Sequence, residues 1–141
     1  LNFRATVGMV VAVSIVPAGI LGLIGWFKIP LDVISAPAAN VCIGMAVDAM
    51  IHLTMAARKS DHWKDNRWQA WTDARSQQWM SILNSALVVG AGFGIFALSS
   101  FPPTQRFGVA VVLGTIIAAM AALFVLPVLA GYGKAKEQKA S

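Results

Sequence analysis

Four long apolar runs dominate this sequence, and the short polar stretches between them carry nearly every charge. The runs cover residues 6–27, 33–57, 80–98 and 107–129. A helix needs about 20 apolar residues to cross the roughly 30 Å hydrocarbon core of a bilayer. Each run is close to that length. We therefore predict one all-α domain, a polytopic membrane helix bundle of about four transmembrane helices.

Composition argues against a soluble domain. Hydrophobic residues make up 57% of the 141 residues and charged residues 12%, whereas soluble domains carry about 25% charge. The single cysteine, Cys42, lies inside an apolar run and has no partner for an internal disulfide or a metal cluster. The sequence contains no nucleophile–base pair and no phosphate-binding loop. We expect no enzymatic activity, no cofactor and no metal site.

The net charge of +5 is explained by orientation in a membrane rather than by nucleic-acid binding. Five Lys and Arg residues lie in the polar link 58–79 and three in the tail 131–141, while Lys28 and Arg106 are alone on the opposite side. Basic residues accumulate on the cytoplasmic side of membrane proteins. We therefore expect the link, the tail and both chain ends in the cytoplasm, most simply of a bacterial inner membrane.

The start of the chain has two unusual features. It opens with Leu1 rather than Met, and its first apolar run is longer than the 7–15 residues of a signal-peptide core. These features lead us to expect a piece of a longer polypeptide.

The polar link 58–79 is rich in tryptophan. Trp68, Trp71 and Trp79 fall on roughly one face of a helix, and aromatic residues favour the headgroup region. This pattern favours an interfacial amphipathic helix on the cytoplasmic side. An ordinary loop anchored by tryptophans is the alternative.

A polar ridge runs along the second apolar segment. Asn40, Gly44, Asp48 and His52 follow one another at spacings of four, so they share one helical face. A carboxylate inside the membrane costs about 2.5–3.5 kcal/mol even on lenient insertion scales, and it usually faces a bundle interior or an aqueous path. Asp48 is therefore either a proton-relay residue or a structural anchor that holds the bundle together. Two ligands, Asp48 and His52, do not make a metal site.

The last two apolar segments offer polar residues and close-packing glycines. Asn84 and Ser85 lie early in the third segment, where they can hydrogen-bond to Asp48 or His52, or simply join helices. Gly90 and Gly94 form a small-xxx-small pair, and Gly114 lies in a row of small residues at four-residue spacing. Such rows allow helix backbones to approach closely.

Several segments together resemble the RND superfamily of transporters, especially its MMPL-type exporters and their sterol-sensing relatives. Residues 44–53 (GMAVDAMIHL) are similar to the family stretch G-x-G-x-D-[YD], and residues 85–100 contain a Gly-Phe-Gly core. Residues 101–102, 106–108 and 126–127 are similar to the turn into the last helix and to its close. Ala46 stands where the motif has its second Gly, and Ala49 stands where it has Tyr or Asp.

The resemblance implies a proton-driven exporter with twelve helices in two similar halves. This chain looks like the last four helices, and the matching part of the first half, where the same motif recurs, is the alternative. It assigns the proton relay to Asp48. On the exporter hypothesis, we expect His52 and Asn84 to tune Asp48 or to pass the proton on. The implied partners are membrane lipids, a hydrophobic or lipid-like substrate and the remaining half of the transporter. A non-transporting sterol-sensing or scaffold bundle, with Asp48 as a structural anchor, is the alternative.

Overall fold

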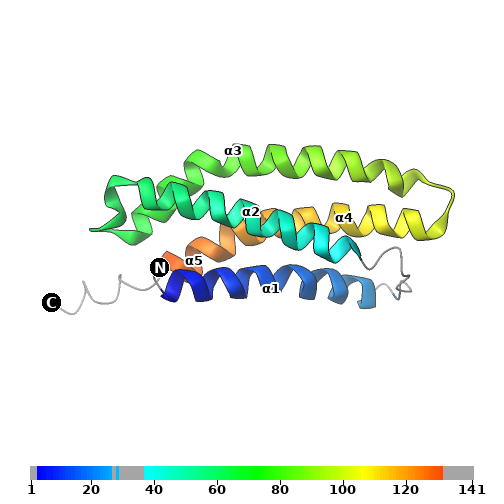
Figure 1. Ribbon diagram of the computed structural model, residues 1–141, viewed down its shortest axis with the longest axis horizontal. Helices are drawn as coiled ribbons and strands as arrows, with labels where there is room; N and C mark the ends of the chain where they lie inside the picture. Colours follow the sequence, from blue (N-terminus) through cyan, green and yellow to red (C-terminus); the bar gives the residue numbers. More distant parts are fainter. Residues whose placement is uncertain (1–2, 27, 29–36, 132–141) are drawn as a thin grey trace.

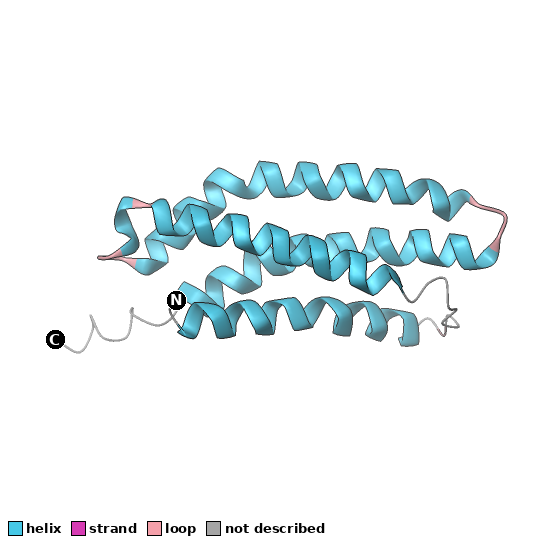
Figure 2. Ribbon diagram, viewed as in Figure 1, coloured by secondary structure: helices cyan, strands magenta, loops and turns pink. Residues whose placement is uncertain are grey.

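The computed structural model describes residues 3–26, 28 and 37–131. Every regular element within them is a helix (Figure 2). In chain order these are α1 (Phe3–Trp26), α2 (Pro37–Lys59), the short η1 (Asp61–Trp63), α3 (Arg67–Gly94), η2 (Ile95–Leu98), α4 (Pro102–Met120), η3 (Ala121–Val125) and α5 (Leu126–Gly131). The long helices run side by side along one axis, with α1 and α3 on opposite edges of the view (Figure 1).

Four helical segments are long and apolar enough to cross a membrane, which confirms the all-α bundle expected from the apolar runs. They are Thr6–Trp26, Pro37–Lys59, Arg67–Leu98 and Pro102–Gly131. Residues 33–36, which we assigned to the second span, and the tail 132–141 lie outside the described residues.

The interfacial helix predicted within the link 58–79 needs correction, because residues 67–79 are the first turns of α3. Asn66 caps this helix by accepting a hydrogen bond from the backbone N–H of Gln69 at 3.3 Å. No Gly or Pro interrupts residues 67–89, so nothing ends the helix before the apolar segment begins. At about 1.5 Å per residue, α3 is roughly 42 Å long and extends well beyond the hydrocarbon core.

The helix α4 occupies the middle of the bundle and contacts α1, α2 and α3. The apolar window of Pro102–Gly131 is 56% buried, against 6% for the window of Arg67–Leu98. Its buried face carries the small residues Gly108, Ala110, Gly114, Ala118 and Ala122. Without large side chains at these positions, the neighbouring helices pack against α4 at short distance.

Aromatic side chains secure both ends of the bundle. At one end, Trp71 is almost fully buried and lies 6.5 Å from the ring of Trp63, centroid to centroid. At the other end, the rings of Phe93, Phe96 and Phe107 form a cluster with centroid distances of 5.7 to 6.2 Å. These clusters fix the α2–α3 and α3–α4 connections.

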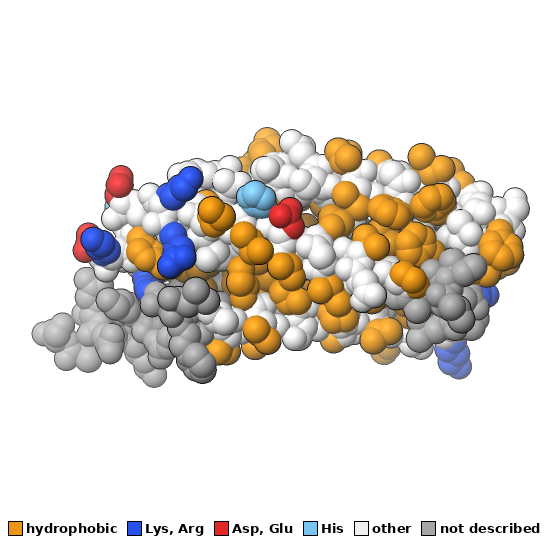
Figure 3. Space-filling view, in the orientation of Figure 1, with side chains coloured by type: hydrophobic (Ala, Val, Ile, Leu, Met, Phe, Trp, Pro, Cys, Tyr) orange, Lys and Arg blue, Asp and Glu red, His pale blue; other side chains and the backbone are white. Residues whose placement is uncertain are grey.

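The surface matches a membrane-spanning body. Apolar side chains cover the middle of the face drawn in Figure 3, and charged side chains gather toward one end. An acidic side chain beside a histidine interrupts the apolar middle of this face (Figure 3). That interruption marks the polar ridge of α2.

Candidate functional site

Asp48 is the central residue of the 23-residue helix α2. The buried face of α2 consists of Ala38, Cys42, Ala46, Met50, Leu53 and Ala57. Asp48 lies off that face, and its side chain is 75% exposed. A carboxylate at this depth cannot face lipid without a cost of about 2.5–3.5 kcal/mol.

His52 lies one helical turn after Asp48 and pairs with it. The distance from Nε2 of His52 to Oδ1 of Asp48 is 3.4 Å, and the histidine side chain is 64% exposed. Within the described residues, the polar contact of Asp48 is thus with its own helix rather than with a neighbouring one. The pair can exchange or share a proton while both side chains stay accessible from one side.

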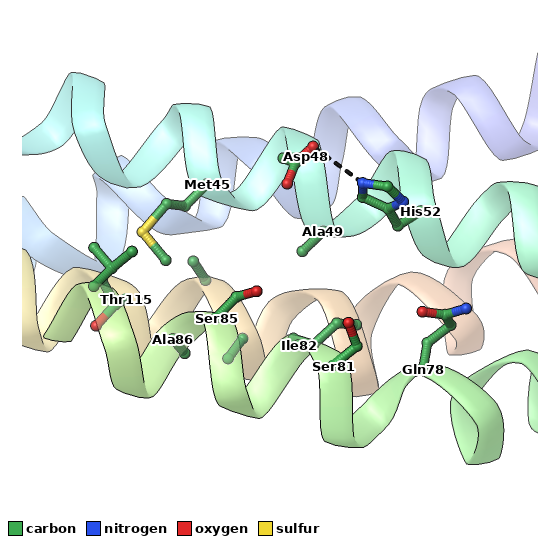
Figure 4. Close-up of a pocket in the computed structure, with 13 residues that line it drawn as sticks. Met45, Asp48, Ala49, His52, Gln78, Ser81, Ile82, Ser85, Ala86 and Thr115 are labelled. Carbon is green, nitrogen blue, oxygen red and sulfur yellow. Dashed lines mark ion pairs between the residues drawn. The ribbon is translucent and has the colours of Figure 1, made fainter.

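The pair opens onto a groove between α2 and α3 with a volume of about 240 Å³ (Figure 4). Gln78, Ser81 and Ser85 of α3 line its opposite wall at spacings of three and four residues. Ala118 and Ala119 of α4 contribute to its base. Polar side chains from two facing helices therefore line one groove beside Asp48.

The other residues predicted for this site lie elsewhere. Asn40 and Gly44 are exposed on the same face of α2, but they do not line the groove. A side chain at Gly44 would meet nothing within 4 Å. Asn84 is exposed on α3 and does not line the groove, whereas its neighbour Ser85 does.

The predicted packing glycines differ in how closely they are approached. A Cβ on Gly90 would lie 3.6 Å from Oγ1 of Thr115, and one on Gly94 would lie 3.7 Å from Cγ2 of Val112. Both distances are ordinary van der Waals contacts. At Gly114 a Cβ would overlap Sγ of Cys42, so only a glycine fits there.

Three polar residues of the groove were not predicted from the sequence. Gln78 and Ser81 fall where the polar link was expected to join the third span. Their spacing to Ser85 becomes meaningful only once α3 is one continuous helix. Thr115 lies within an apolar run of the sequence. The residue is 1% exposed, and its hydroxyl donates a hydrogen bond to the carbonyl of Val112 at 2.8 Å.

A second histidine–carboxylate pair lies at the basic end of the bundle. Nδ1 of His62 is 3.3 Å from Oδ2 of Asp73, and the hydroxyl of Ser60 donates to the same oxygen at 3.3 Å. This pair ties η1 to α3 and does not line the groove beside Asp48. Among the described residues, no group of three or more His, Cys, Asp or Glu side chains is arranged to hold a metal ion.

Comparison with known protein families identifies the chain. The model of the MMPL family matches residues 3–140. The chain belongs to the MMPL family. This MMPL-family chain is an integral membrane protein with four helices able to span the bilayer, and family membership supports a transporter-like role. Searches of curated proteins and of solved structures each found no significant match.

Proposed function

We propose that this MMPL segment is part of the membrane domain of an exporter driven by the proton gradient, with Asp48 as the residue that takes up and releases the proton. The observation that carries the proposal is the exposed Asp48–His52 pair at the middle of α2, beside a groove that Gln78, Ser81 and Ser85 of α3 also line. An intramembrane carboxylate in such a setting is typical of proton relays.

The exposure of Asp48 supports a partner surface beyond the described helices. Because a mid-span carboxylate is costly in lipid, the polar face of α2 must meet water or polar protein in the membrane. The remaining half of the transporter fits this requirement. On this proposal, His52 receives or returns the proton of Asp48, and the hydroxyls of Ser81 and Ser85 hold water in the groove.

The distribution of charge supports an orientation with the basic end in the cytoplasm. Arg58, Lys59, Lys64, Arg67 and Arg75 lie at or near the α2–α3 connection, whereas Lys28 and Arg106 lie at the other end. The groove then opens toward the cytoplasmic side through His52 and Gln78, which also line a second cavity of about 290 Å³ beside Lys59 and Ser60. Hydrophobic or lipid-like molecules are the proposed substrates, and on this proposal they bind to parts of the transporter outside this chain.

The structural-anchor alternative has no matching contact among the described residues. An anchoring carboxylate would hydrogen-bond to a neighbouring helix, but within these residues Asp48 pairs with His52 on α2 itself. The relay interpretation is therefore the one that the geometry favours.

The test is substrate-dependent proton flux in proteoliposomes that contain the full-length protein. We expect Asp48→Asn to abolish the flux, because the amide keeps the size of the side chain but cannot carry a proton. Asp61→Asn is the matched control, since Asp61 is an exposed carboxylate in η1 away from the groove. A folded Asp48→Asn variant with unchanged flux would contradict the relay and favour a sterol-sensing or scaffold bundle.

A further inference from the structure

A further groove, distinct from the two cavities described above, lies between α3 and α4. It is apolar and opens to the outside of the bundle. Its volume is about 540 Å³, within the roughly 300–1,000 Å³ of small-molecule sites. Its walls include Leu83, Leu87 and Gly90 of α3 and Ile116 and Met120 of α4. Leu87 is 70% exposed, so the groove is not closed by the described helices.

A cation stands at the basic end of this groove. The guanidinium of Arg75 lies 5.9 Å from the ring centroid of Phe124, and Phe124 lines the groove. Arg75 is exposed, and neither ion pair found in the described part of the chain includes it. A ring face satisfies none of the five N–H donors of a guanidinium in the way that an anion does.

Along α3, the side chains from the cation into the groove become progressively less polar. Arg75, Trp79, Leu83 and Leu87 follow at four-residue spacing on roughly one face of α3. Arg75 lies about 12 Å along the helix from Leu83, at 1.5 Å per residue. A charged side chain, then an indole, then aliphatic side chains follow one another along the helix. A phospholipid places its phosphate, its glycerol region and its acyl chains in the same order.

The π-helical turn η3 shapes the basic end of the groove. Leu123 and Phe124 lie in this turn, and both line the groove although they are adjacent in sequence. Turns of this kind are rare in proteins, and many of those that do occur lie at functional sites. Phe124 of this turn therefore both lines the groove and lies beneath the guanidinium of Arg75.

From these observations we infer that the α3–α4 groove binds one anionic phospholipid of the adjacent leaflet. The phosphate pairs with Arg75, the glycerol region lies at Trp79 and Phe124, and one acyl chain fills the groove between Leu83 and Gly90. A helix of another protein or of the same transporter would not require a cation at the mouth of the groove. The inference does not rest on the proton relay. The two grooves share only the side chains of Ala86, Thr115 and Ala119, and neither Arg75 nor Phe124 lines the Asp48 groove.

The test uses the full-length protein in phosphatidylcholine vesicles that contain a trace of a photoreactive lipid, with the diazirine on the acyl chain. The probe is phosphatidylglycerol in one sample and phosphatidylcholine with the same chains in the other. Labelled peptides are located by mass spectrometry. We expect labelling within residues 83–124, with phosphatidylglycerol preferred by about fivefold, which corresponds to about 1 kcal/mol.

Four variants separate the contributions. Arg75→Gln should remove the preference for phosphatidylglycerol, whereas Arg58→Gln, an exposed arginine at the end of α2, should retain it. Leu87→Trp should reduce labelling by both lipids, because the larger side chain fills the groove from an exposed position. Asp48→Asn should leave labelling unchanged, so that failure of the relay and failure of the lipid site remain distinguishable.

Two results would overturn the inference. Equal labelling by both lipids in the wild type would mean that Arg75 does not recognise the headgroup. Absence of label from residues 83–124 would mean that protein, not lipid, covers the groove.

Discussion

Gly114 of α4 lies directly against Cys42 of α2, so that a methyl group on the glycine would overlap the cysteine sulfur. The same methyl group would lie 2.8 Å from Cδ1 of Ile20 on α1. Three helices therefore meet at one glycine, and both partner side chains are buried. The absence of a side chain at Gly114 therefore lets α1, α2 and α4 pack together at this level of the bundle.

Replacing Gly114 by Ala should destabilise the protein by about 1–3 kcal/mol, the usual cost of overpacking. The measurement is thermal unfolding of the purified protein in detergent. Gly92→Ala is the control, because a Cβ there meets nothing within 4 Å, and it should be neutral or stabilising. Adding Cys42→Ala to Gly114→Ala should recover part of the loss, since the two sites are in contact. If Gly114→Ala and Gly92→Ala were equally stable, α4 would not be held at this contact.

Replacing Gly108 by Ala should be worse and should not be rescued by trimming a side chain. A Cβ at Gly108 would lie 2.6 Å from the backbone nitrogen of Ala97 and 2.8 Å from the carbonyl oxygen of Phe93. Backbone atoms cannot move aside by changing rotamer, so we expect a loss at or above about 3 kcal/mol. The same unfolding assay would show this, with Gly94→Ala as a milder neighbour. A Gly108→Ala variant as stable as Gly94→Ala would contradict the tight α3–α4 turn.

Trp71 should be a major source of stability at the basic end. It is 1% exposed and packs beside Gly131, where an added Cβ would lie 3.6 Å from Cδ1 of Trp71. Trp71→Ala should cost about 3–5 kcal/mol because it leaves a large cavity. Trp71→Phe should cost less, since the indole N–H is buried and finds no acceptor among the described residues.

Trp26→Ala is the matched control for Trp71, because the Trp26 side chain is 84% exposed. Its effect should stay within about 0.5 kcal/mol. If Trp71→Ala were equally harmless, the α3 segment 67–79 would not be packed on the bundle and would lie free, as an interfacial helix does.

His52 and His62 provide a matched pair for the proposed relay. Each pairs with an aspartate, but only His52 lines the groove beside Asp48. His52→Gln should reduce proton flux in proteoliposomes less severely than Asp48→Asn, because it removes a proton partner but not the carboxylate. His62→Gln should leave the flux unchanged. A loss of flux confined to His62→Gln would place the proton path at the basic end instead.

The groove beside Asp48 could be predicted only in part. Spacing alone placed Asp48 and His52 on one face of α2, because a helix repeats every 3.6 residues. The facing wall depended on where α3 begins. The tryptophans and charges of residues 67–79 predict a separate interfacial helix, which hides the spacing from Gln78 to Ser81 and Ser85. The sequence therefore points to Asn84 and Ser85 rather than to Gln78 and Ser81.

Hydropathy and charge alone determined the class of this protein: four membrane-spanning helices, a basic end and one carboxylate in mid-span. These are properties of single segments, which follow from the thickness of the bilayer and the cost of charge within it. Only the tertiary structure decided that α4 is central, that Gly114 is the crowded glycine and that the polar ridge of α2 stays exposed. Those outcomes depend on which helical faces meet, and the choice is made by contacts between residues far apart in sequence, such as Cys42 and Gly114.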